Sequence, residues 1–164
     1  MITSNILLGE NVYIEKSSSV NNVRIGDNTR IASSVNIFGS AKDLLEIGES
    51  CYIGPGCTLE GFNAKVQIGS NVSFAQNINL MSGSGPNGSK RLQNLFPLQK
   101  GEVTIGDHSW IGAGVIIMPH VTLGKFCIVA ANSFVNKSFD DFSIIGGNPA
   151  KLIRTLTAEE IAKL

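Results

Sequence analysis

Residues 105–135 read IGDHSWIGAGVIIMPHVTLGKFCIVAANSFV, and an aliphatic residue recurs in this stretch at every sixth position. These aliphatic residues are Ile105, Ile111, Ile117, Leu123, Val129 and Val135. Glycine often follows the aliphatic residue, and a small or β-branched residue lies four positions after it. A period of six leaves no apolar face on an α-helix, whose period is 3.6. The stretch therefore predicts a succession of short strands, each followed by a bend.

The same spacing occurs in four further runs nearer the N-terminus. The runs are Leu8, Ile14 and Val20; Ile25, Ile31 and Ile37; Ile47, Ile53 and Leu59; and Ile68, Phe74 and Leu80. Together the runs give eighteen hexads, which group into six coils of three. Three hexads closing a triangular coil, stacked about 4.8 Å from the next coil, bury a continuous apolar column. We therefore predict an all-β fold, a left-handed parallel β-helix of about six triangular coils.

The interruptions of the repeat predict loops that leave the coils. Four extra residues lie between Ile37 and Ile47, three between Leu59 and Ile68, and a long insertion covers residues 81–102. The start of this long insertion is rich in Gly and Ser, so we expect it to leave the coils as a mobile arm. Its middle is apolar, with Leu92, Leu95, Phe96 and Leu98. An exposed loop of this composition predicts contact with a neighbouring subunit.

The repeat ends after Val135, and residues 140–149 read as a turn region. Residues 157–164 predict a short α-helix, because Thr157 and Glu160 have the spacing of a capping box. We expect this helix to cover the open end of the coils, where strand edges are otherwise unpaired. The predicted organisation is thus a β-helix domain over residues 1–156, with the arm inserted at 81–102, and a capping helix over residues 157–164.

Composition and charge restrict the class of function. Lys plus Arg and Asp plus Glu each number 13, so the formal charge is zero, and the chain lacks the basic stripe of a nucleic-acid binder. No apolar run is long enough to span a bilayer and no signal peptide is evident, so a cytoplasmic location without a membrane span is expected. The three cysteines form no CxxC pair and only two histidines exist, which argues against a metal site. Cys51, Cys57 and Cys127 all occupy the small inward position of a hexad, so we expect them to be buried.

The chain resembles the hexapeptide-repeat acyltransferases over residues 25–155. The resemblance lies in the hexads, in the Trp110-Ile111-Gly112 step and in the segment Gly146-Gly147-Asn148-Pro149-Ala150-Lys151. The likeness is greater to the galactoside, maltose and other sugar O-acetyltransferases, including those that modify surface polysaccharides. It implies a homotrimer with its active sites in the clefts between neighbouring subunits, an acetyl-CoA donor lying along the cleft and a small-molecule or saccharide acceptor near the arm.

The resemblance also implies roles for particular residues. Trp110 matches the tryptophan that helps to form the acceptor and acyl pocket, although a surface aromatic packed between subunits is an alternative. The other matches are to donor contacts: Ala113 and Ala131 along the pantetheine arm, Asn136 and Lys137 near the far end of the cofactor, and Lys151 and Arg154 close to the nucleotide phosphates. Lys151 and Arg154 could instead be solvated charges ahead of the last helix.

The sequence departs from the family at the catalytic base. Acetyl transfer to a hydroxyl needs a group that takes its proton, and in the family this is a histidine in the arm. Counted along the repeat, that histidine should fall near Gly85, and no histidine is present there. By repeat arithmetic His120 lies above Gly83, at the root of the arm, where the family has a glycine. His120 is therefore the candidate base, or simply a surface histidine at a corner, and Ser84 and Asn87 are candidates to orient the hydroxyl.

Three functions follow from these residues. The first is acetyl-CoA-dependent O-acetylation of a sugar hydroxyl, in surface polysaccharide or saccharide metabolism. The second is N-acylation of an amino sugar, because an amine is a better nucleophile and needs less help from a base. The third is a β-helix that binds a ligand or partner without chemistry, which the missing arm histidine favours and the retained Trp110 disfavours.

Overall fold

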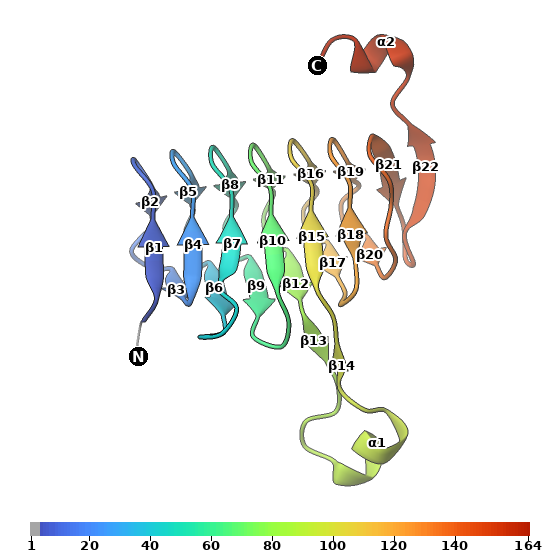
Figure 1. Ribbon diagram of the computed structural model, residues 1–164. Coiled ribbons are helices and arrows are strands. Elements are labelled where there is room, and N and C mark those ends of the chain that lie inside the picture. Colours follow the sequence, from blue (N-terminus) through green and yellow to red (C-terminus); the bar gives the residue numbers. More distant parts are fainter. Residues whose placement is uncertain (1–3) are drawn as a thin grey trace.

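The computed structural model describes residues 4–164 and has the predicted architecture (Figure 1). Short strands wind left-handed through six coils, and three parallel sheets form the sides of a triangular column. Sheet A contains β1 (Ile6–Leu8), β4 (Val23–Ile25), β7 (Leu45–Ile47), β10 (Val66–Ile68), β15 (Val103–Ile105) and β18 (Thr122–Leu123). Sheet B contains β2 (Tyr13–Ile14), β5 (Arg30–Ile31), β8 (Tyr52–Ile53), β11 (Ser73–Phe74), β16 (Trp110–Ile111), β19 (Ile128–Val129), β21 (Ser143–Gly146) and β22 (Lys151–Thr155). Sheet C contains β3 (Ser19–Asn21), β6 (Asn36–Gly39), β9 (Thr58–Gly61), β12 (Asn79–Met81), β17 (Ile116–Ile117) and β20 (Phe134–Val135).

The aliphatic residues of the repeat point into the column. From Ile25 to Val135, each predicted core position is at most 3% exposed, and Phe74 is among the largest of the fully buried side chains. The first coil is less well covered, since Leu8 is 49% exposed and no coil lies below it. The prediction for the cysteines is confirmed: all three thiols are free and buried. Desolvation raises the pKa of each thiol, which makes these groups poor nucleophiles.

At many corners of the coils the third residue after an inward aliphatic has a positive φ. Asparagine is common at these positions, and both histidines also occupy them, His108 with φ 59° and His120 with φ 69°. The ring of His108 stacks on Phe126 with centroids 4.6 Å apart, and Phe126 stacks on Phe142. His108 therefore belongs to an aromatic stack along one corner.

The end of the chain differs from the prediction. Residues 143–146 were expected to be part of a turn region, but they form β21, because Ser143 and Ile145 point inward and continue sheet B by one strand. The next strand, β22, pairs with β21 in the antiparallel sense. Helix α2 (Ala158–Ile161) has the predicted capping box of Thr157 and Glu160. It stands away from the column in Figure 1 and buries no residue, so β22 covers the strand edge that the helix was expected to cover.

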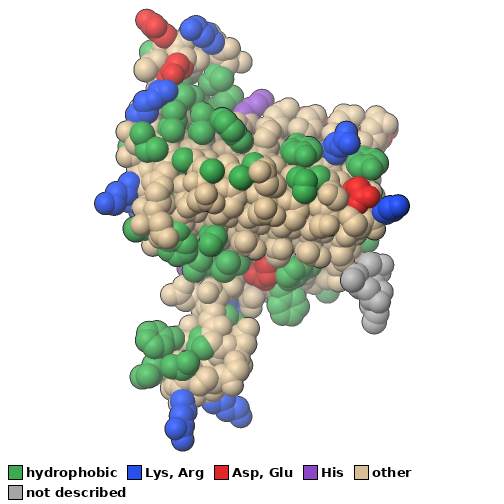
Figure 2. All heavy atoms as spheres, turned by 180° about the vertical axis from the view of Figure 1, so that it is seen from behind, with side chains coloured by type: hydrophobic (Ala, Val, Ile, Leu, Met, Phe, Trp, Pro, Cys, Tyr) green, Lys and Arg blue, Asp and Glu red, His purple; other side chains and the backbone are tan. Residues whose placement is uncertain are grey.

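The arm projects from the column between β12 and β15 and has secondary structure of its own (Figure 1). Strands β13 (Gly83–Ser84) and β14 (Gln99–Lys100) form an antiparallel pair, and α1 (Lys90–Leu95) lies at the far end. Its helix is capped by the Ser89 side chain, which accepts from Leu92 N–H. In Figure 2 hydrophobic side chains gather on the arm and basic side chains stand at its tip. No helix within residues 4–164 is long and apolar enough to cross a membrane.

Candidate active site

The root of the arm is fixed by one carboxylate. Glu60, on the outer side of β9, accepts hydrogen bonds from the backbone N–H groups of Ser82 at 2.9 Å and Gly83 at 3.1 Å. Its other oxygen accepts from the N–H groups of Phe62 at 2.6 Å and Asn63 at 3.2 Å. The buried Ser82 hydroxyl lies beside the carboxylate and accepts from Asn63 N–H at 3.1 Å. These bonds hold the arm in one direction as it leaves the column.

The arm contains the two predicted hydroxyl-orienting residues, each at the edge of a hollow. Ser84 is half-buried and lines a hollow of about 410 Å³ between the two strands and the segment after α1. Asn87 is exposed and borders an adjoining hollow of about 270 Å³. The amide of Gln93 on α1 donates to the Pro86 and Asn87 carbonyls at 2.9 and 3.1 Å, which holds the turn against the helix.

His120 lies at the root of this arm. Its exposed ring packs against Gly101, the residue that follows β14; a Cβ at Gly101 would lie 2.4 Å from Cγ and Nδ1 of the ring. Gly101 N–H in turn donates to Ser82 O at 2.9 Å. Repeat arithmetic predicted that His120 lies above Gly83, and the register of β12 with β17 is the one used in that count. The residue that lies against the ring is Gly101, and a Cβ at Gly83 would meet the Asn63 side chain. Gly101 reaches this place because it directly follows the returning strand of the arm, β14.

The next coil adds two more predicted residues at this corner. Asn136 and Lys137 follow β20, and Ser138 after them donates to His120 O at 3.5 Å and accepts from Thr122 N–H at 2.9 Å. The Lys137 ammonium lies 5.4 Å from the centroid of the Phe139 ring. We define the arm corner as the arm root, His120, Asn136 and Lys137, all at the turns that lead from sheet C to sheet A.

A second group of predicted residues lies on and beside sheet B. The Trp110 side chain is 56% exposed and lies in register between Ser73 and Ile128 of the neighbouring coils. Ala113 and Ala131 occupy equivalent turns one coil apart, where Asn132 N–H donates to Ala113 O at 2.8 Å. These turns continue from the end of β16 and β19 toward sheet C.

The two basic residues of this second group lie on β22, the last strand of sheet B. Arg154 forms a two-pronged ion pair with Glu160, with Nη1–Oε2 2.7 Å and Nη2–Oε1 2.9 Å. This pair, helped by Thr157 N–H, lowers the pKa of Glu160 to about 2. Lys151 makes no ion pair within residues 4–164. Arg154 therefore ties α2 to the column, and Lys151 is the freer cation.

The predicted residues thus fall on two different sides of the chain. In a triangular coil the corner between sheets C and A lies opposite sheet B, so one copy cannot bring His120 and Trp110 to one reacting centre. Both residues belong to the fifth coil, which spans β15 to β17, and so they lie at the same height along the column.

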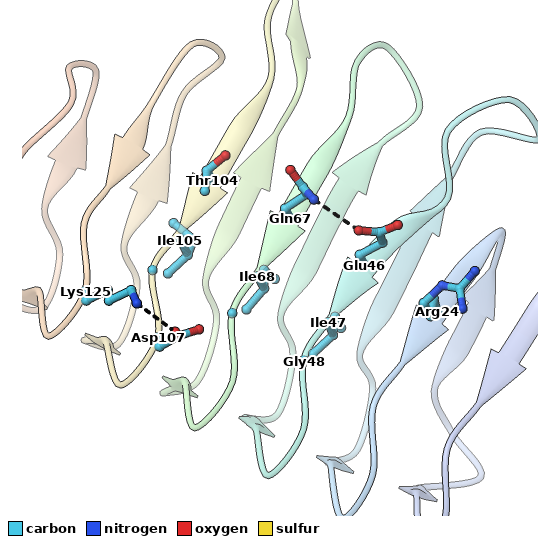
Figure 3. A pocket seen from close by; sticks show the side chains of 12 residues that line it. Arg24, Glu46, Ile47, Gly48, Gln67, Ile68, Thr104, Ile105, Asp107 and Lys125 are labelled. Carbon is cyan, nitrogen blue, oxygen red and sulfur yellow. Dashed lines mark hydrogen bonds and ion pairs between the residues drawn. The ribbon is translucent and has the colours of Figure 1, made fainter.

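The outer face of sheet A carries a groove of about 380 Å³, lined by charged and polar side chains together with isoleucines and glycines (Figure 3). Its side chains mostly bond to one another: Gln67 donates to Glu46 at 3.1 Å, and Lys125 pairs with Asp107 at 3.5 Å. None of the predicted site residues lines it. Within residues 4–164 no group of three or more His, Cys, Asp or Glu side chains is placed to hold a metal ion.

Known proteins that are similar to this chain share its hexapeptide repeat and its column. The family described as bacterial transferase hexapeptide (six repeats) matches residues 102–137. The yeast protein YJL218W of Saccharomyces cerevisiae, classed by name as an acetyltransferase, is 37% identical over 123 residues, which are 70% of this chain and 61% of the yeast protein. The chain thus spans about three fifths of that relative's length.

Two further matches cover a larger share of the matched protein. WcaF of Escherichia coli K12, named as an acetyltransferase of colanic acid biosynthesis, is 30% identical over 131 residues, 80% of this chain and 68% of WcaF. The Bacillus cereus N-acyltransferase AntD, solved as its S84T mutant with dTDP and coenzyme A, superposes with a TM-score of 0.83 at 24% identity, covering 99% of this chain and 89% of AntD. With the repeat, the column and these relatives taken together, the chain belongs to the hexapeptide-repeat acyltransferase family.

Proposed function

We propose that the protein transfers an acetyl group from acetyl-CoA to a sugar hydroxyl, in surface polysaccharide or saccharide metabolism. The observation that carries the proposal is the place of His120, whose ring packs on Gly101 at the root of the arm. The arm is where the family carries its basic histidine, and here residue 85 is glycine. A histidine at the arm root supplies the missing base from the adjoining coil.

The reaction follows from these positions. His120 takes the proton of the acceptor hydroxyl while the oxygen attacks the thioester carbonyl carbon. The tetrahedral intermediate then collapses, the C–S bond breaks, and the proton passes to the leaving sulfur of coenzyme A. Ser84 and Asn87, which line the hollows of the arm, hold the acceptor hydroxyl in line for attack.

We place this chemistry between two copies of the chain in a homotrimer. The arm corner of one copy supplies His120, Asn136 and Lys137, and sheet B of its neighbour supplies Trp110. Each set is incomplete alone, because the two lie on opposite sides of one column. The exposed apolar residues of the arm, among them Leu95 at 71% and Phe96 at 65%, are then covered by the neighbouring copy.

The donor runs from the fifth coil toward the end of the column. Ala113 and Ala131 leave their turns open for close approach of the pantetheine arm. Lys151 is the primary phosphate contact, because it has no ion pair whereas both terminal guanidinium nitrogens of Arg154 are bonded to Glu160. Arg154 contributes by holding α2 and β22 in place.

A second candidate is N-acylation of an amino sugar. The specific observation in its favour is Gly85 at the position of the arm histidine, since an amine attacks a thioester with less assistance than a hydroxyl. The AntD structures include one with dTDP-4-amino-4,6-dideoxyglucose and coenzyme A, at 25% identity and a TM-score of 0.83.

The test compares His120→Ala with His108→Ala. His108 is a matched control, because it occupies the same corner position of its hexad but stacks on Phe126 away from the arm. Thiol release from acetyl-CoA is followed with a panel of neutral sugars and amino sugars. We expect His120→Ala to reduce turnover of hydroxyl acceptors by about a hundredfold, the usual scale for a general base, and His108→Ala to retain it. Transfer confined to amino sugars and insensitive to His120→Ala would replace O-acetylation by N-acylation, and full turnover on hydroxyl acceptors would exclude His120 as the base.

A further inference from the structure

Sheet B carries a row of exposed aromatic side chains below Trp110. One outward residue of each coil lies in register with the next along this face. The row reads Tyr13, Arg30, Tyr52, Ser73 and Trp110. Tyr13 is 51% exposed and Tyr52 41% exposed. The outward row of sheet A has no aromatic residue: Leu7, Arg24, Glu46, Gln67, Thr104 and Thr122.

The spacing of the rings is regular. Tyr13, Tyr52 and Trp110 are separated by one intervening strand each, which at about 4.8 Å per strand places them roughly 10 Å apart. Ser73 between Tyr52 and Trp110 is small and leaves the face open. One sugar ring covers a single aromatic platform, so a ligand that occupies all three must be an oligosaccharide.

A hollow of about 430 Å³ lies between the two tyrosines, and its lining is polar as well as aromatic. The Arg30 guanidinium lies 5.1 Å from the centroid of the Tyr13 ring, and it makes no ion pair within residues 4–164. Glu15, which also lines the hollow, accepts two hydrogen bonds from Ser17, both on Oε2. A carboxylate has about four acceptor sites, so Glu15 can accept further hydrogen bonds.

These groups suit a ligand with many hydroxyls. Aromatic faces stack against the C–H face of a sugar ring. The Arg30 guanidinium can donate hydrogen bonds to sugar oxygens, and the Glu15 carboxylate can accept them from sugar hydroxyls. The negative charge of Glu15 beside Arg30 also disfavours a phosphate, which prefers a site of cations alone. The lining therefore favours a saccharide over a nucleotide.

The aromatic row and the proposed donor site lie on opposite sides of Trp110 along the column. The residues proposed to bind coenzyme A extend from the fifth coil toward the C-terminus, and the tyrosines lie on the first and third coils of the same sheet. Donor and acceptor then approach each other from the two ends of one face, and they meet at Trp110.

We infer that Tyr13, Arg30 and Tyr52 form an extended acceptor subsite that binds an oligosaccharide, with its reacting unit at Trp110. The inference rests on the proposed acetyl transfer to a sugar, and it specifies that the acceptor is a chain of several sugar units.

The test uses the full-length protein with coenzyme A on a glycan array that carries bacterial surface oligosaccharides with their component mono- and disaccharides. The wild type is expected to retain oligosaccharides more strongly than their components. Tyr13→Ala and Tyr52→Ala are each expected to weaken this binding about tenfold, the usual effect of removing an aromatic anchor, while Tyr52→Phe retains it. Arg30→Ala is also expected to weaken this binding. Its matched control is Arg24→Ala, which should leave binding unchanged, because the two arginines lie in the same coil on different sheets.

Coenzyme A binding and oligomer mass are measured on the same samples. Coenzyme A binding without retention of any glycan, or glycan binding that survives both tyrosine substitutions, would overturn the subsite and leave the acetyltransferase assignment intact. A change of oligomer mass in the tyrosine variants would assign the row to a subunit contact and also overturn it. Tyrosine-dependent binding of dTDP in place of glycans would reassign the hollow to a nucleotide. Tyrosine-dependent glycan binding without coenzyme A binding would support the subsite and reject the proposed transfer.

Discussion

Substituting Gly101 by alanine should disable His120 without changing any side chain of the candidate machinery. A Cβ at residue 101 would lie 2.4 Å from Cγ and Nδ1 of the imidazole and 2.6 Å from Cδ2, where ordinary contact requires about 3.4 Å. The backbone of Gly101 is tied to Ser82 O by a 2.9 Å hydrogen bond, so the ring is the part that yields, by about 1 Å. A displacement of this size in a catalytic group costs on the order of a hundredfold in rate.

The assay is thiol release from acetyl-CoA with an acceptor that the wild type acetylates. Gly88→Ala is the matched control in the same arm, because a Cβ there meets nothing within 4 Å, and it should keep full turnover. We expect Gly101→Ala to be impaired about as much as His120→Ala, and the double variant to be no worse than either alone, since both changes remove the same function. Normal turnover by Gly101→Ala, in a protein whose His120 ring resonances have shifted, would refute the reasoning.

Three further outcomes test other parts of the structure. Glu60→Ala removes the oxygen Oε2 that accepts from both arm-root amides, so the Gly83 amide should exchange its hydrogen about tenfold faster, while the Ser82 amide keeps its bond to the Glu60 backbone carbonyl; unchanged exchange at Gly83 would mean that the carboxylate does not hold the arm. The pKa of Glu160 is lowered to about 2 from an ordinary 4.5, so its ion pair with Arg154 stabilises α2 above pH 4.5 and is lost as the pH falls toward 2. The NMR chemical shifts of α2 should therefore move between pH 4.5 and pH 2, and a transition centred at pH 4.5 would contradict the ion pair. Phe74→Ala empties a fully buried position and should lower the free energy of unfolding in urea by about 3–5 kcal/mol, whereas Phe62→Ala, at a 66% exposed position, should change it by less than about 0.5 kcal/mol.

The column could be predicted from sequence because its signal is repeated. The inward position of each hexad, from Ile25 to Val135, is fixed by the period of six, and the same register placed Cys51, Cys57 and Cys127 inside. The capping box at Thr157 was equally local and is present. Such features depend on residues a few positions apart or on neighbours in the next coil.

Features that depend on longer or irregular paths were missed. Strand β21 lies beyond the last hexad, and the inward alternation of Ser143 and Ile145 is too short a signal to recognise alone. The arm helix begins at Lys90 inside a Gly- and Ser-rich segment that indicates a loop. Glu60 gave no sequence signal either, because its partner amides at Ser82 and Gly83 lie more than twenty residues away, at the start of an insertion.

In the candidate site too, the repeat predicted some positions, whereas contacts that depend on the path of the arm or on the last strand were missed. Repeat arithmetic placed His120 near the arm root but missed Gly101, since the length of the arm does not reveal where its second strand returns. The ion pair of Arg154 with Glu160 crosses from β22 to α2, six residues apart and outside any helical spacing, so it could not be read from the sequence. Whether His120 and Trp110 meet depends on a second copy of the chain.

Acetyl-CoA binding in a calorimeter, with oligomer mass measured on the same sample, tests whether the donor site is completed between copies of the chain. We predict a trimer that binds one acetyl-CoA per chain, and a Trp110→Ala variant that remains trimeric but binds acetyl-CoA more weakly. A well-folded trimer with no binding at millimolar acetyl-CoA, or stoichiometric binding by a monomer, would contradict this prediction.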